Sequence, residues 1–147
     1  MTKTTSKLLS DLKQMDSYED FNQANATELV VPDVIKLLLE MAKSHGLTKA
    51  ELVQATGLER TFAYHLLSGE KTMTRDKLLL FAFAGKLDLE QTQQLLKYAG
   101  LGMLYARDKR DGVLIYALNK HYSVYEMEKL LEDLGLNLPL GTEKSGK

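Results

Sequence analysis

The chain has 147 residues, a hydrophobic fraction of 44%, a charged fraction of 27% and a formal net charge of −1. This length suffices for a globular domain with its own core, and the composition is ordinary for a folded protein. The sequence has no cysteine, which excludes disulfides and thiolate chemistry, and its net charge argues against a protein coated in positive charge. Leu, Ala, Lys, Glu and Gln dominate and only two prolines occur, so we predict an all-α fold. No apolar run has the length of a membrane span and no signal peptide begins the chain, so we expect a cytoplasmic protein without membrane contact.

In chain order, the first predicted element is a short helix over residues 5–15, with leucine and methionine on one side. A polar stretch then breaks the periodicity, so residues 1–31 are assigned to an N-terminal helix and a connector. Pro32 occupies the first-turn position of the next helix, where its missing N–H is tolerated, and Gly46 ends that helix. The apolar stripe of this second helix consists of Val34, Leu37, Leu38 and Met41.

Two short helices follow, joined at a single glycine. Thr48 and Glu51 form a predicted capping box at the start of the first one, which ends at Gly57, where positive φ is tolerated. The second short helix is predicted over about residues 59–67. Thr74 caps the longer helix that comes next.

The second half of the sequence contains a repeat with an offset of 35 residues, in which residues 75–102 align with residues 110–137. Each copy has the pattern of a helix, a tight turn and a second helix, so we predict two stacked hairpins that share one core. An Arg-Asp pair opens each copy, at 75–76 and 110–111. We interpret the pair structurally, with Asp complementing the helix dipole and Arg covering apolar surface. The predicted caps of the second helices are Asp88 with Gln91 and Ser123 with Glu126.

The twenty residues from Lys49 to Ser68 fit a helix-turn-helix unit, with Gly57 at its turn. This unit has a helix before it and a fifth helix after it, over residues 88–99. The sequence segments that carry the resemblance are LTKAELVQATGL and LLSGEKTMTRDKLLLFA. With that context, residues 32–100 resemble a lambda-repressor-like (XRE-type) domain of five helices.

The part of the chain beyond this domain has two predicted segments. Residues 101–140, a C-terminal helical hairpin, are similar to the helical extension found on some bacterial members of the family. Residues 141–147 are predicted to be a disordered tail. We expect the hairpin to serve in dimerisation, effector sensing or binding of a protein partner, because it carries more apolar surface than one hairpin can bury.

In lambda-repressor-like domains the second helix of the unit enters the major groove of DNA. The resemblance implies that Arg60 contacts a guanine in bidentate fashion and that Tyr64 contacts a phosphate or a thymine methyl group. Lys43 and Arg75 would contact phosphates from the flanks. The DNA-binding residues implied in this way are Lys49, Arg60, Thr61, Tyr64, His65, Ser68 and Lys71.

Each of these roles has an alternative that the sequence leaves open. Arg60 could be a solvated helix residue, Tyr64 could pack against a neighbouring helix, and His65 could face solvent or a protein. Glu59 and Glu70 lie near the proposed groove face and would repel phosphate. A single copy would therefore bind DNA weakly, which favours a homodimer on a two-fold site.

Sequence features of an enzyme are missing. The three histidines lack acidic or cysteine partners at metal-ligand spacing, and neither a glycine-rich phosphate loop nor a nucleophile elbow occurs. We therefore expect no catalytic residues, no cofactor and no metal.

Two functional hypotheses remain. The first is a sequence-specific transcriptional regulator, in particular a repressor, that binds a double-stranded DNA operator as a homodimer. The alternative is a protein-interaction adaptor or an antitoxin that uses the helix-turn-helix fold to bind a protein partner. The near-neutral charge and the acidic residues beside the second helix favour the alternative.

Overall fold

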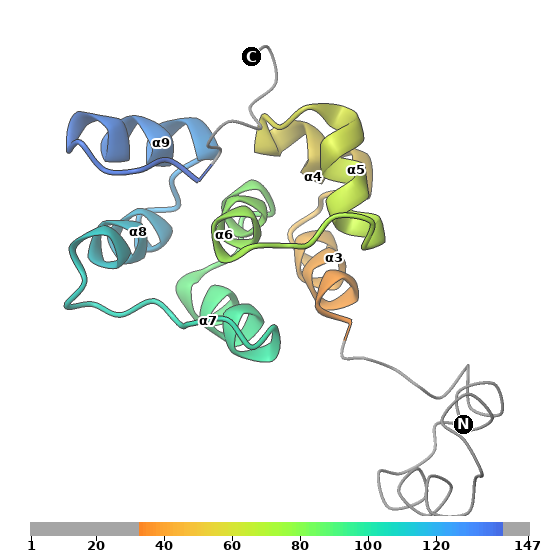
Figure 1. Cartoon of the computed structure of the whole chain (residues 1–147), viewed down its shortest axis with the longest axis horizontal. Helices are drawn as coiled ribbons and strands as arrows, with labels where there is room; N and C mark the ends of the chain where they lie inside the picture. Colours follow the sequence, from red (N-terminus) through yellow and green to blue (C-terminus); the bar gives the residue numbers. More distant parts are fainter. Residues whose placement is uncertain (1–32, 140–147) are drawn as a thin grey trace, which may run out of the picture. The chain divides into compact units, whose positions relative to one another are not determined.

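The computed structural model describes residues 33–139, so the predictions for residues 1–31, for Pro32 and for the tail over residues 141–147 lie outside the described part. Its regular elements are seven helices, which confirms the all-α prediction for residues 33–139 (Figure 1). None of these helices is long and apolar enough to cross a membrane. The helices are α3 (Val34–Ser44), α4 (Lys49–Thr56), α5 (Arg60–Ser68), α6 (Arg75–Ala84), α7 (Leu89–Tyr98), α8 (Lys109–Asn119) and α9 (Val124–Asp133).

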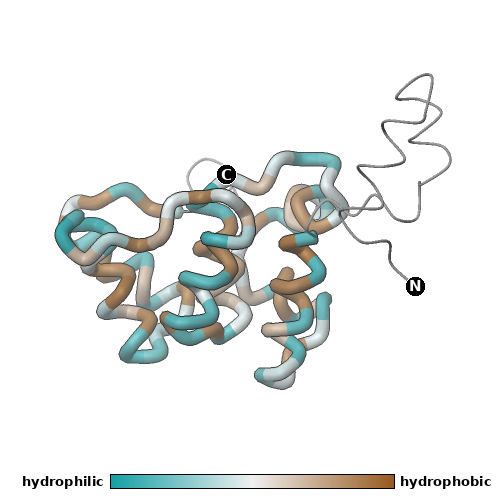
Figure 2. Tube along the Cα trace, turned by 90° about the horizontal axis from the view of Figure 1, so that it is seen from below, coloured by the Kyte–Doolittle hydropathy of each residue, from teal (hydrophilic) through white to brown (hydrophobic). Residues whose placement is uncertain are grey.

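Helix α6 forms the centre of the core. Every residue from 77 to 84 is buried, and all of these except Lys77 are apolar. The helix contacts α3, α4, α7 and α9 (Figure 1). A helix that is apolar all round must be enclosed by other helices. Hydrophobic and hydrophilic residues alternate along the helices around it, as expected for elements with one buried face (Figure 2).

The same kind of turn joins the two helices of each of three hairpins, α3–α4, α6–α7 and α8–α9. Each turn contains a residue with positive φ: Gly46 (86°), Lys86 (61°) and His121 (59°). The residue after it donates its N–H to the carbonyl of an alanine near the end of the preceding helix. These bonds join Leu47 to Ala42, Leu87 to Ala82 and Tyr122 to Ala117, at 3.0–3.1 Å.

The second helix of each hairpin begins with a capping box, as predicted. The boxes are Thr48 with Glu51, Asp88 with Gln91, and Ser123 with Glu126. The 35-residue repeat predicted two of these hairpins and missed the first. The reason is that α5 lies between α4 and α6. The positive-φ residues of the three turns, at positions 46, 86 and 121, are therefore 40 and 35 residues apart, and no constant offset aligns them.

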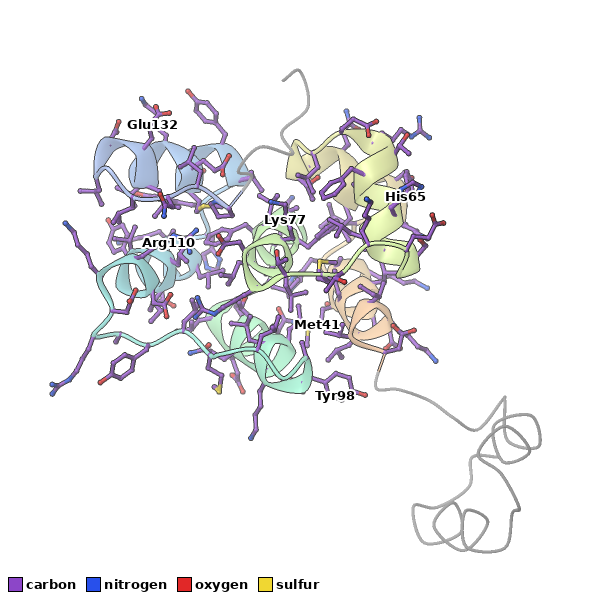
Figure 3. The ribbon with its side chains drawn as sticks, in the orientation of Figure 1. Met41, His65, Lys77, Tyr98, Arg110 and Glu132 are labelled. Atoms are coloured by element: carbon purple, nitrogen blue, oxygen red, sulfur yellow. The ribbon has the colours of Figure 1, made fainter. Side chains whose placement is uncertain are left out.

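Two reciprocal ion pairs join the α6–α7 hairpin to the α8–α9 hairpin. The guanidinium of Arg75 donates to both carboxylate oxygens of Asp111, at 2.9 and 3.2 Å. Arg110 donates in the same way to Asp76, also at 2.9 and 3.2 Å (Figure 3 labels Arg110). We call these four residues the Arg–Asp exchange.

Backbone carbonyls complete the Arg–Asp exchange. The Nε of Arg75 donates to the carbonyl of Gly102 at 2.7 Å, and the Nε of Arg110 donates to that of Asn137 at 2.9 Å. Both bonds span 27 residues, so the contact itself repeats with the sequence. The repeated Arg-Asp motif is thus structural, but its arginines form ion pairs rather than only covering apolar surface.

Candidate nucleic-acid interface

Helix α5 is held by its neighbours through one buried face. Gly57 ends α4 with φ 76°, and the buried hydroxyl of Thr56 accepts the N–H of Leu58 at 3.2 Å, which fixes the short link. Within α5 the residues at the core are Ala63, Leu66 and Leu67. The opposite face is therefore available to a partner.

The candidate residues differ in exposure along that face. Arg60, Thr61 and Ser68 are exposed, whereas Tyr64 and His65 are half-buried. Lys49 on α4 and Lys71 after α5 are exposed as well. Tyr64 also packs against the core, so this half-buried residue combines a structural contact with partial exposure.

Lys49, Arg60 and Tyr64 come together as a cation–aromatic cluster. The Nζ of Lys49 and the Cζ of Arg60 each lie 5.7 Å from the centroid of the Tyr64 ring. This distance is within the range of a cation–π interaction, which restrains a long side chain without neutralising its charge. Each cation is the first residue of its helix, so two helix starts place positive charge on one surface.

Glu59 is the N-cap of α5, one residue outside the helix. Its carboxylate accepts the N–H groups of Thr61 at 2.9 Å and Phe62 at 3.0 Å. These hydrogen bonds, the one from the Thr61 amide first, lower the pKa of the Glu59 carboxyl below its usual value. The carboxylate thus occupies the free amides that would otherwise attract an anion. The sequence indicated a repulsive charge here but not the cap, because glutamate is not among the preferred N-cap residues.

The remaining candidate DNA-binding residues lie in the last turn of α5 and just after it. The Nε2 of His65 lies 3.4 Å from a carboxylate oxygen of Glu70 (Figure 3 labels His65). The hydroxyl of Ser68 donates to the carbonyl of His65 at 3.2 Å, and the same carbonyl accepts the N–H of Lys71 at 3.1 Å. The hydroxyl of Ser68 therefore serves the helix end, while the Lys71 side chain extends from an exposed residue.

The flanking cations have different surroundings. Lys43 is exposed in the last turn of α3. Arg75 donates to Asp111 and to the carbonyls of Gly102 and Met103, so its guanidinium is already engaged in the Arg–Asp exchange. Most donors of Arg75 therefore serve the fold, and its phosphate contact stays a prediction.

No group of three or more His, Asp or Glu side chains within residues 33–139 is arranged to hold a metal ion. The comparisons with protein-family models, with curated proteins and with solved structures found no match for this chain.

Proposed function

We propose that this protein is a sequence-specific DNA-binding transcriptional regulator, a cytoplasmic repressor that binds a double-stranded operator as a homodimer. In this proposal α3 to α7 form the lambda-repressor-like arrangement, and α5 enters the major groove. The observation that carries the proposal is the cation–aromatic cluster of Lys49, Arg60 and Tyr64 on the accessible side of α5.

The cluster suits base recognition because it restrains Arg60. A guanidinium that rests on an aromatic ring loses less side-chain freedom when it binds, and its planar fork matches the O6 and N7 acceptors of guanine. Arg60 forms no ion pair among the described residues, so its donors remain available. Lys49 would contact a phosphate at the same site, with Thr61, His65, Ser68 and Lys71 along the rest of the face.

The acidic neighbours support a two-fold complex. Glu59 and Glu70 are exposed beside this face, and the imidazole of His65 is already close to Glu70. Their repulsion of phosphate lowers the affinity of one copy, and a second copy on a symmetric operator restores affinity because both half-sites bind together.

The second candidate function is a protein-interaction adaptor or antitoxin. The capped start of α5 favours it, because Glu59 places a carboxylate where a DNA-binding helix would present amides to phosphate. In this candidate the face of α5 binds a protein groove, and the C-terminal hairpin provides a further surface for a partner.

The deciding experiment is selection of bound sequences from a pool of random duplexes, followed by fluorescence anisotropy with wild type, Arg60→Ala and Arg107→Ala. Arg107 is an exposed residue between α7 and α8, so its substitution removes the same charge away from α5. We expect a palindromic site, a loss of about 1–3 kcal/mol in Arg60→Ala with relaxed preference at one base pair, and wild-type affinity in Arg107→Ala.

Two other outcomes would contradict the DNA-binding proposal. If no sequence is enriched at low salt, where phosphate attraction is strongest, the DNA-binding proposal is wrong and the protein-binding candidate replaces it. If both arginine variants lose the same affinity, binding depends on net charge and α5 does not read bases.

A further inference from the structure

A cleft of about 750 Å³ opens where the three hairpin turns meet, on elements other than α5. Its volume lies within the range of small-molecule sites, roughly 300–1,000 Å³. Residues from each of the three turns contribute to its walls.

The floor of the cleft is apolar. Phe83, Leu87, Leu118 and Val124 line it and are at most 9% exposed. Tyr125 stands at its edge with 74% of its surface exposed, an unusual value for a large aromatic residue. An apolar floor with an aromatic edge favours a ligand with an apolar body.

The charged side chains at the rim of the cleft differ in whether the fold already uses them in hydrogen bonds or ion pairs. The carboxylate of Asp88 accepts the N–H of Gln91 at 2.8 Å, and that of Glu126 accepts the N–H of Ser123 at 2.9 Å, so both serve helix caps. Lys86 and His121 form no ion pair within residues 33–139. Hydrogen bonds with Thr48 lower the pKa of the exposed Glu51 carboxyl, and the positive charge of Lys86 adds a small contribution.

Lys86 and His121 share an unfavourable backbone conformation. They are the non-glycine residues with positive φ in the described part of the chain, and Gly46 occupies the equivalent position of the first hairpin. Glycine adopts this conformation more readily than any L-residue. Strained residues of this kind cluster at ligand sites, where the side chain has a role that glycine could not fill.

We infer that this cleft binds a small amphiphilic anion, with an apolar body on Phe83, Leu118 and Val124 and one anionic group at Lys86 and His121. The His45 ring, whose Nε2 lies 2.8 Å from the amide oxygen of Gln91, adds a polar group at the same rim. The site belongs to the hairpin turns, so it does not depend on whether α5 binds DNA.

The first test compares two probes of equal chain length and opposite charge, octanoate and octylammonium, on the full chain. Binding is followed by the NMR signals of the His121, Tyr125 and Phe83 rings. We expect saturable shifts with octanoate and several-fold weaker binding of octylammonium. The inference is overturned if octanoate causes no saturable shift at these rings, or if the two probes bind equally.

Substitutions then test the charge and the volume separately. Lys86→Met keeps the length of the side chain, and Lys97→Met removes the same charge from an exposed position on α7, outside the cleft. We expect octanoate binding to weaken roughly two- to five-fold in Lys86→Met and to stay unchanged in Lys97→Met. Equal affinities in the two variants would contradict the assigned charge.

The volume test uses Ala55→Trp, because Ala55 is exposed on α4 and its substitution leaves the buried floor intact. The indole would fill the cleft, so we expect octanoate binding to disappear while the circular dichroism spectrum stays that of wild type. Undiminished binding in a folded Ala55→Trp variant would place the probe elsewhere and refute the inference.

Discussion

The arginines at the starts of α5 and of the two later hairpins have opposite surroundings. Arg60 is exposed and lies over the ring of Tyr64, with no carboxylate in contact. Arg75 and Arg110 each donate to an aspartate of the other hairpin and to a backbone carbonyl. An arginine can bind a ligand only with donors that the fold has not used, so the repeated arginines join hairpins and Arg60 remains available to a partner.

The two pairs of the Arg–Asp exchange also differ from each other. The side chain of Asp111 is 10% exposed and also accepts the N–H of Tyr105, whereas that of Asp76 is 40% exposed. Water can replace a lost arginine at Asp76 much more easily than at Asp111. The pairs therefore look equivalent in sequence but should contribute unequally to stability.

The largest effect is expected for Arg75→Ala, which leaves the buried Asp111 without its partner. We expect the free energy of unfolding to fall by about 2–4 kcal/mol, because an unpaired buried charge is strongly unfavourable. Urea denaturation measures this, with Arg107→Ala as the control for loss of an exposed arginine. Equal stabilities of the two variants would mean that the Arg–Asp exchange does not stabilise the fold.

A smaller effect is expected for Arg110→Ala, whose partner Asp76 is accessible to water. We expect a loss of about 1–2 kcal/mol in the same urea experiment, because solvent screens the remaining carboxylate. A loss as large as that of Arg75→Ala would show that burial of the aspartate is not what distinguishes the two pairs.

Glu59→Ala tests the start of α5, because this carboxylate stabilises the helix start next to Arg60. We expect the free energy of unfolding to fall slightly, because the N–H groups of Thr61 and Phe62 lose their acceptor. Under the DNA-binding proposal, affinity for DNA should rise roughly two- to five-fold, since the exposed amides and the lost charge both favour phosphate.

The matched control for this substitution is Glu90→Ala, which removes an exposed glutamate from the first turn of α7. Urea denaturation and fluorescence anisotropy follow both variants. A decrease in DNA affinity in Glu59→Ala, with stability unchanged, would contradict the assigned cap and its effect on phosphate.

The smallest effect is expected from acid acting on Asp111. Burial raises the pKa of this carboxyl. Hydrogen bonds from Arg75 and the Tyr105 amide, together with the charges of Arg75 and Arg110, lower the pKa by more than burial raises it, so the pKa is below its usual value. The unfolded chain then binds a proton before the folded one does. The stabilisation is complete above the ordinary aspartate pKa of about 3.9 and is lost as the pH falls through the lower folded pKa.

Asp111→Asn tests this pH dependence, because asparagine cannot titrate. We expect the stability of wild type, measured by urea denaturation at a series of pH values below about 5, to fall more steeply than that of the variant. The effect is small because a protonated carboxyl still accepts hydrogen bonds. Parallel curves for the two proteins would show that Asp111 does not carry the acid dependence.

The helices and the three capping boxes could be predicted because the interactions that fix them are local. Thr48 with Glu51 and Ser123 with Glu126 span three residues each, and all described capping boxes follow the predicted pattern. The start of α5 was placed one residue early, since Glu59 precedes the helix as its cap. The shared surface of Lys49, Arg60 and Tyr64 follows from how α4 and α5 cross, which no local pattern specifies.

Local patterns in the sequence specify the helical class over residues 33–139, the three capping boxes and the repeat of two hairpins. The pairing of Arg75 with Asp111 and of Arg110 with Asp76, at separations of 36 and 34 residues, depends on the tertiary packing. The same holds for the cleft that residues of three turns line. The physical reason is the range of the forces involved. Caps and turns satisfy backbone groups within a few residues, whereas ion pairs and clefts depend on which helices the burial of apolar surface brings together.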